Sequence, residues 1–88
     1  MTSYTDIQVA ELLQSQFPES IMVVVRKGGA SNFMVFNTEY EILSYVVSLR
    51  SNRIIFNDNY LMMNIVGGGI VLQFIRESVY NNVKQQLI

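Results

Sequence analysis

The stretch MNIVGGGIVLQF (residues 63–74) decides the fold, because three consecutive glycines separate two apolar runs that are rich in β-branched residues. Glycine adopts positive φ angles without steric cost, and β-branched residues favour strands. The pattern therefore predicts a β-hairpin, with Gly67–Gly69 as a three-residue loop and Val66 opposite Ile70. The paired strands would cover residues 60–66 and 70–75.

A single helix from Ile70 to Ile88 is the main alternative to this hairpin. Apolar residues recur there at every fourth position, as a helical stripe requires: Val71, Ile75, Val79, Val83 and Leu87. In that case the glycines would precede a helix N-terminus, where anions bind. The sequence leaves both structures open and favours the hairpin.

The glycines do not match a known phosphate-binding or membrane-spanning pattern. A Walker loop ends in Gly-Lys-Ser/Thr, whereas Ile70 and Val71 follow Gly69 here, and Leu72 breaks the G-x-G-x-x-G fingerprint. Residues 59–75 carry no charge, but they include three glycines, two asparagines and a glutamine, whereas a spanning helix needs about 20 mainly apolar residues. We expect no nucleotide, no other cofactor and no membrane span.

Capping signals and turn residues predict the remaining elements. Thr5 with Gln8, and Thr38 with Glu41, have the spacing of capping boxes at two helix starts. The expected elements, in chain order, are a helix over 5–17, a strand before Gly28–Gly29, its partner over 33–36, a helix over 37–52, two strands around Asp58–Asn59, the strand after the glycines, and a closing helix over 76–88. In the first helix Val9, Leu13 and Phe17 form the apolar stripe, with Ala10 beside it. In the second helix Asn52 is the expected left-handed stop.

Together these elements predict one compact α+β domain over residues 1–88. Its expected architecture is a single-layer, mainly antiparallel sheet with the helices on one face, in the order α-β-β-α-β-β-β-α. The strand phenylalanines and the adjacent pair Met62–Met63 are interpreted as core residues. A partner-binding surface is the less favoured alternative for the methionines, because Met adapts to irregular contacts.

The composition predicts an interface. Half of the residues are hydrophobic and only 15% are charged, against about 25% in a typical soluble domain. So few charges cannot cover a small globule, and a large apolar patch usually marks an interaction surface. We therefore expect a homodimer. The net charge of −1 divides into −3 over residues 1–44 and +2 over residues 45–88, a polarity that would help two chains to pack head to tail.

The residue inventory argues against catalysis and metal binding. The chain has no histidine and no cysteine, so the commonest general base, metal ligand and thiolate nucleophile are absent. Glu39 and Glu41 point apart on a helix and do not form a carboxylate pair. We expect no enzyme, no catalytic residue and no metal site.

The concentrated positive charge supplies the candidate binding residues. Arg26, Lys27 and Asn32 surround the Gly28–Gly29 turn, and we expect the first two to be exposed. Arg50 and Arg53 flank the junction after the second helix. The plain alternative is that these residues form a solvated hairpin tip and compensate a helix dipole.

The function expected from these features is that of a small protein-interaction module. It would act as a regulator (an inhibitor, adaptor or assembly factor) by occupying a partner that presents an acidic patch. A phage or plasmid origin would suit such a chain, and the lack of a secretory signal suggests the cytoplasm. The alternatives are a nucleic-acid-associated regulator that uses the Arg/Lys clusters and a non-catalytic subunit of an enzyme complex.

Overall fold

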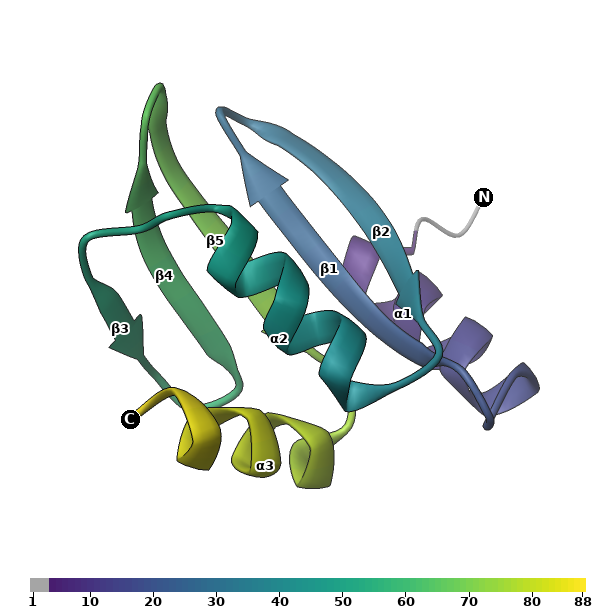
Figure 1. Cartoon of the computed structure of the whole chain (residues 1–88). Helices are drawn as coiled ribbons and strands as arrows, with labels where there is room; N and C mark the ends of the chain where they lie inside the picture. The colour runs from purple at the N-terminus through teal and green to yellow at the C-terminus, as the bar shows by residue number, and fades with distance from the viewer. Residues whose placement is uncertain (1–3) are drawn as a thin grey trace.

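The computed structural model describes residues 4–88, which form three helices and five strands (Figure 1). The helices are α1 (Asp6–Gln16), α2 (Glu39–Ser48) and α3 (Glu77–Leu87). The strands are β1 (Ile21–Lys27), β2 (Ala30–Phe36), β3 (Ile54–Phe56), β4 (Tyr60–Ile65) and β5 (Gly68–Phe74). The order α-β-β-α-β-β-β-α confirms the predicted small α+β fold.

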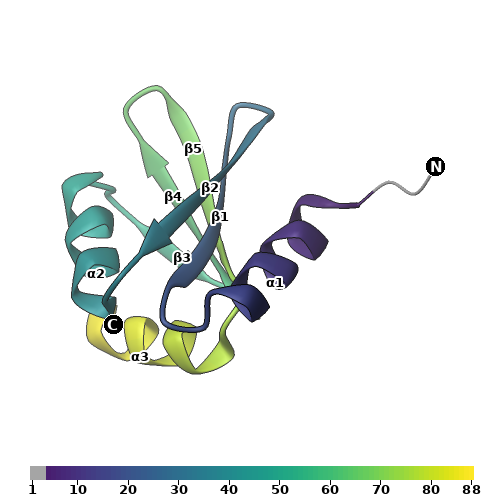
Figure 2. The ribbon, with the colours of Figure 1, turned by 90° about the vertical axis from the view of Figure 1, so that its right-hand side faces the viewer.

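The strands form one sheet in the order β2-β1-β5-β4-β3, and every neighbouring pair is antiparallel. β1 is an interior strand, between its hairpin partner β2 and β5, which is distant in the sequence and central in the sheet. The ribbon views place α2 and α3 on one side of the sheet and α1 on the other (Figures 1 and 2). We call the side that faces α2 and α3 the inner face and the side that faces α1 the outer face.

The predicted helix starts are confirmed. The Gln8 amide donates to Thr5 Oγ1 at 3.2 Å, and the Thr5 amide donates to Gln8 Oε1 at 2.9 Å, which completes a capping box. At α2 the Glu41 amide donates to Thr38 Oγ1 at 3.2 Å. The return bond of the second predicted box is missing from the hydrogen bonds of residues 4–88, so Thr38 caps α2 without help from the Glu41 side chain.

The three glycines belong to a β-hairpin, as predicted. Extended backbone over β5 excludes the alternative of one long helix, because α3 begins only at Glu77. The chain turns twice by the same means, since the Gly28–Gly29 turn between β1 and β2 also uses positive φ angles, of 58° and 83°.

The length of the glycine loop differs from the expectation. The ladder pairs Ile65 with Gly68 and Met63 with Ile70, so only two residues lie in the loop and the predicted pairing of Val66 with Ile70 is wrong. Gly67 supplies the positive φ, of 96°, that closes this two-residue loop. Gly68 therefore belongs to the strand, although its φ is +131°.

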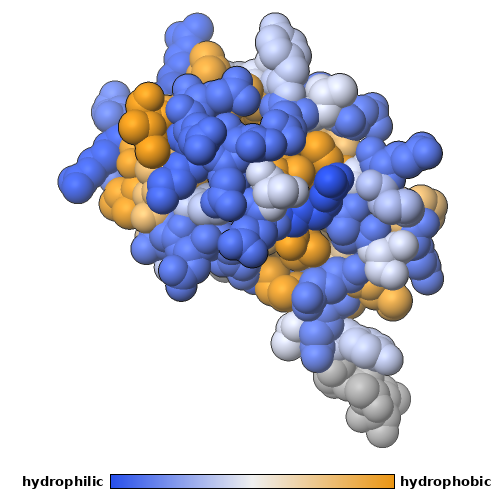
Figure 3. All heavy atoms as spheres, turned by 90° about the horizontal axis from the view of Figure 1, so that it is seen from below, coloured by the Kyte–Doolittle hydropathy of each residue, from blue (hydrophilic) through white to orange (hydrophobic). Residues whose placement is uncertain are grey.

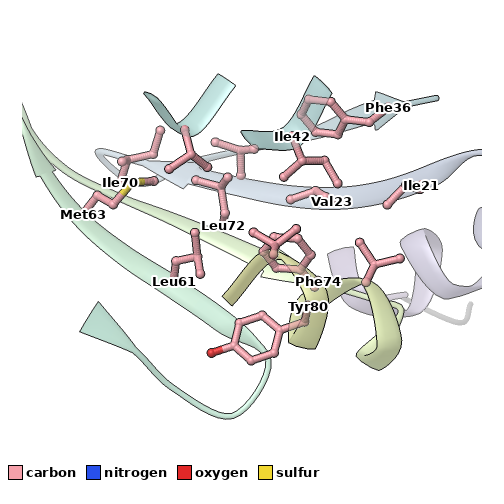
Figure 4. Packing of buried hydrophobic residues seen from close by; sticks show 14 residues of the cluster. Ile21, Val23, Phe36, Ile42, Leu61, Met63, Ile70, Leu72, Phe74 and Tyr80 are labelled. Carbon is pink, nitrogen blue, oxygen red and sulfur yellow. The ribbon is translucent and has the colours of Figure 1, made fainter. Parts of the chain in front are cut away.

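The main core lies on the inner face, where alternate residues of β1, β4 and β5 pack against α2 and α3 (Figure 4). Its members are Ile21, Val23, Val25, Phe36, Ile42, Val46, Leu61, Met63, Ile70, Leu72, Phe74, Val79, Tyr80 and Val83. The view from the α3 end shows polar side chains over most of that surface, with apolar patches at its margins (Figure 3). The solvent side of α3 is therefore an ordinary polar surface.

Tyr80 ties α3 to the connection between β3 and β4. Its ring stacks at a tilt on Phe74, with centroids 5.4 Å apart, and its hydroxyl donates to the carbonyl oxygens of Asn57 and Tyr60. Figure 4 shows this hydroxyl directed at the connecting loop. Burial raises the pKa of Tyr80, because the ionised form would lose its hydration there.

The placement of α1 differs from the expectation that the helices share one face. β1 has five consecutive buried residues, Ile21–Val25, whose side chains alternate between the two faces. Met22 and Val24 therefore point outward, and they are buried because α1 covers them. A strand that is apolar on both faces needs cover on both, and α1 supplies the second layer.

The buried side of α1 also differs from the predicted stripe. Ala10 and Gln14 are buried, whereas Phe17 is 56% exposed. The Gln14 side chain donates to the carbonyls of Phe17 at 3.1 Å and Ser20 at 2.6 Å, and it accepts from the Met22 amide at 3.0 Å. One glutamine thus holds the end of α1, the following turn and the start of β1 together.

We expect Gly68→Val to destabilise the fold by about 1–3 kcal/mol, because a β-branched residue is strained at positive φ. Gly69→Ala is the matched control, since Gly69 lacks a positive φ and a Cβ there would meet only ordinary contacts, at 3.8 and 3.9 Å. Urea unfolding of both variants checks this. Equal stability of the two variants would contradict the assignment of strain to Gly68.

We expect Gln14→Ala to destabilise the fold by about 2–3 kcal/mol, because three backbone groups lose their partner where water is largely excluded. Gln16→Ala on the exposed side of the same helix is the control and should change stability by less than about 0.5 kcal/mol. Thermal and urea unfolding measure both effects. Similar losses in the two variants would mean that helix propensity, and not the bonds of Gln14, matters here.

Candidate interaction surface

The predicted basic residues lie at one end of the sheet. Arg26 and Lys27 close β1, and Arg53 precedes β3. The ladders place Lys27, Ile70, Met63 and Ile54 in one row across β1, β5, β4 and β3, so Arg53 lies at the same end as the β1–β2 hairpin tip. About three strand spacings, or roughly 14 Å, separate the two groups. The fold therefore aligns them without bringing them into contact.

Arg26 takes part in a network that fastens α1 to the sheet. Its guanidinium lies 2.9 Å from Asp6 Oδ1 and donates to Gln73 Oε1 at 2.5 Å. Ser31 donates to the other Asp6 oxygen at 2.7 Å. The bonds from Ser31 and Arg26 lower the pKa of Asp6. The expectation that Arg26 is freely exposed is therefore corrected, since its charge is paired and its side chain is half-buried.

The other predicted residues are exposed. Lys27 and Arg26 point to opposite faces, as strand alternation predicts, with Lys27 on the inner side. Asn32 lies on the edge strand β2. Arg50 has a left-handed φ of 52° and ends the α2 segment, so the predicted left-handed stop at Asn52 is wrong by two residues. Arg53 borders a hollow on the outer face.

The hollow lies over β3, β4 and β5, beside the region that α1 covers. Ile55, Met62 and Val71 supply its apolar wall, and Gly69 leaves room in its floor because it has no side chain. The volume is about 90 Å³. Arg53 and Asn64 give it a polar rim.

The hollow belongs to a larger apolar outer face. The register places Ser31, Arg26, Val71, Met62 and Ile55 in one row across all five strands. At the β3 side Ile55 and Met62 are 41% and 40% exposed. We call Ile55, Met62 and Val71 the outer patch.

A second exposed group lies at the other end of the outer face. Phe33 and Val35 on β2 are 41% and 58% exposed, and they pair with Val24 and Met22 under α1. The helix thus covers the middle of the outer face and leaves both flanks open. The interpretation of Phe33 as a core residue is corrected.

Sequence reasoning missed the outer patch because it treated Met62 and Met63 as one core pair. Adjacent strand residues face opposite ways, so only one of them can enter the inner core. Met63 is buried and Met62 is exposed. Strict application of strand alternation would have identified Met62 as a surface residue.

Within residues 4–88, no group of three or more His, Cys, Asp or Glu side chains is placed to hold a metal ion. None of the helices in that range is long and apolar enough to cross a membrane. Comparison of the chain with family models, curated proteins and solved structures finds no match.

We expect Arg26→Ala to lower the midpoint of thermal unfolding by a few degrees at pH 7, because it removes the ion pair and the bond to Gln73. The lowered pKa of Asp6 sets the pH dependence of this difference. The bonds of ionised Asp6 contribute stability at pH values above 3.8, the ordinary pKa of this carboxyl group. This stability is lost as the pH falls through the lowered pKa that Asp6 has in the folded state. The difference between wild type and variant should therefore shrink at low pH.

Lys27→Ala is the control for this prediction, because the Lys27 side chain is exposed and makes no hydrogen bond or ion pair within residues 4–88. It should leave the unfolding midpoint unchanged at both pH values. An equal effect of the two substitutions at pH 7 would show that the Arg26 network does not fasten α1.

Proposed function

We propose that this chain is a non-enzymatic protein-interaction module that occupies the surface of a partner protein and works as a homodimer. The observation that carries the proposal is the outer patch, where the exposed side chains of Ile55 and Met62 lie next to the half-buried Val71 on three neighbouring strands, beside the cover of α1. Contiguous exposed apolar surface of this kind is typical of binding sites. An inhibitor, an adaptor and an assembly factor all act through such a surface.

The charge around the outer patch supports an acidic partner. Arg53 borders the hollow and is exposed, whereas the other nearby base on this face, Arg26, already pairs with Asp6. A rim cation next to an apolar centre attracts a complementary carboxylate and raises the association rate. A partner with an apolar side chain flanked by Asp or Glu would meet both features.

The pairing of Arg26 makes nucleic-acid binding the weaker alternative. A phosphate-binding surface needs several unpaired cations on one face. Of the predicted basic residues, Arg26 is neutralised and Lys27 points to the inner face. The remaining arginines, Arg50 and Arg53, form a small group, which favours a rim for a protein partner.

We expect the double substitution Ile55→Gln and Met62→Gln to weaken partner binding about tenfold or more, because it replaces the apolar centre of the outer patch with amides. The measurement is binding of the partner recovered from the native host to immobilised wild-type and variant chains. Circular dichroism should show the same fold for both, because these side chains are outside the inner core.

Val66→Gln is the matched control. Val66 is fully exposed at the tip of the β4–β5 hairpin, away from the outer patch. It should bind the partner like the wild type. Full binding by the double variant, or an equal loss in Val66→Gln, would contradict the assignment of the binding surface.

A further inference from the structure

The strand β2 forms an open edge of the sheet. It has seven residues and pairs only with β1 within residues 4–88. Figure 2 looks onto this edge, and no ribbon segment crosses it between α2 on one side and α1 on the other. An uncovered strand of this length is a template for pairing with another strand.

The backbone groups that point out of this edge can be assigned from the hairpin. In a two-residue turn of the Gly28–Gly29 kind, the flanking residues Lys27 and Ala30 form a hydrogen-bonded pair. Antiparallel pairs then alternate, so Ser31, Phe33 and Val35 direct their N–H and C=O groups away from β1. No backbone bond from elsewhere in residues 4–88 satisfies these groups.

The β2 edge lacks the features that usually prevent pairing. Its residues, Ala30–Phe36, include no charged side chain and no proline, the two commonest protections of an edge strand. The opposite edge, β3, has only three residues and follows Arg53 directly. Of the two edge strands, β2 is therefore the one that is suited to pair with a further strand.

We infer that two copies of this chain join through their β2 edges, antiparallel about a two-fold axis at Phe33, into one continuous sheet of ten strands. This rests on the homodimer of the proposed function and names its interface. The axis places Phe33 opposite the partner's Phe33, and Ser31 opposite the partner's Val35. Three outward-facing residues on each copy then gain hydrogen-bond partners, in an isologous contact that closes at two chains.

Charge favours a second copy as the occupant. In a two-fold pairing the residues near the axis meet their own copies, so a charged strand would repel itself, whereas β2 is uncharged. The antiparallel direction also brings the Lys27 end of one copy beside the α2 start of the other. Lys27 points to the inner face, where α2 begins with Glu39 and Glu41. Lys27 lies one strand in from the interface, on the same face as these carboxylates, so the charges of the two copies are compatible with this direction of pairing.

The arrangement leaves the outer patch free. In each copy β4 is separated from β2 by β1 and β5, so the two Met62 side chains lie about seven strand spacings apart, roughly 30–35 Å in a flat sheet. Both would lie on the same face of the joined sheet. The dimer thus presents two partner-binding patches side by side, and a bivalent partner would bind both.

Light scattering at micromolar concentration should give about twice the chain mass of 10.1 kDa for the wild type. Phe33→Lys alone and Phe33→Glu alone should give the single-chain mass, because like charges meet on the axis. An equimolar mixture of the two variants should restore the doubled mass, since Lys then faces Glu. Ile55→Lys, at a side chain of equal exposure on the other edge, should keep the wild-type mass.

A measurement on the wild type covers the case in which the charged variants fail to fold. The amides of Ser31, Phe33 and Val35 should exchange slowly with deuterium in the concentrated sample and quickly after dilution below the dimerisation constant. Fast exchange of these amides in a dimeric sample would overturn the β2 interface, and so would a doubled mass in both single variants.

The experiments separate this inference from the proposed function. A monomeric wild type would overturn both the β2 interface and the homodimer, while binding to the outer patch is read independently through Ile55 and Met62. A dimer that persists in both Phe33 variants would overturn only the interface and leave the homodimer standing.

Discussion

The burial of β1 on both faces is the constraint on which the rest of the structure depends. Five consecutive residues, Ile21–Val25, are almost inaccessible to solvent, so the strand needs neighbours on both edges and a layer on each side. β2 and β5 supply the edges. The inner side is closed by α2 and α3, and the outer side by α1. The ladder to β5 joins the two halves of the chain and makes the sheet continuous.

The helix layer on the outer face is narrow, and this explains why apolar side chains are exposed on that face. α1 has eleven residues and packs mainly along β1, whereas the sheet is five strands wide. Two polar anchors hold the helix there. Gln14 bonds the start of β1, and Asp6 pairs with Arg26 at its end. Both flanks of the outer face stay open, with Phe33 and Val35 exposed on one and Ile55 and Met62 on the other.

This arrangement also changes the role of the charges. Arg26 lies on the outer face near the end of β1 and is used to position α1. Arg53 is left at the rim of the hollow. Arg26 and Arg53 were both predicted as binding residues from the sequence, but they have different roles in the fold, because among residues 4–88 Arg26 has a carboxylate within reach and Arg53 does not. Recognition of a partner then depends more on shape and apolar contact than on a positive field.

Local signals predicted the order of elements and the turns, because capping residues, glycine pairs and alternation act between residues close in the chain. Thr5 with Gln8, Thr38, and Gly28–Gly29 all do what their spacing predicts. The glycine hairpin was predicted as well, although its loop is one residue shorter than expected. Among the candidate site residues, the opposite directions of Arg26 and Lys27 followed from the same alternation.

The sequence by itself determined that this chain forms an α+β fold with a strongly apolar buried strand, Ile21–Val25, and more hydrophobic surface than its charges can cover. Only the tertiary structure decided which face of the sheet each helix covers. Interactions between residues close in the chain do not distinguish the two faces of a strand. The face that a helix covers depends on contacts such as Asp6 with Arg26 and Arg26 with Gln73, across 20 and 47 residues of chain. The same choice left Met62 exposed and buried Gln14, since a side chain becomes surface or core only when distant segments pack over it or fail to do so.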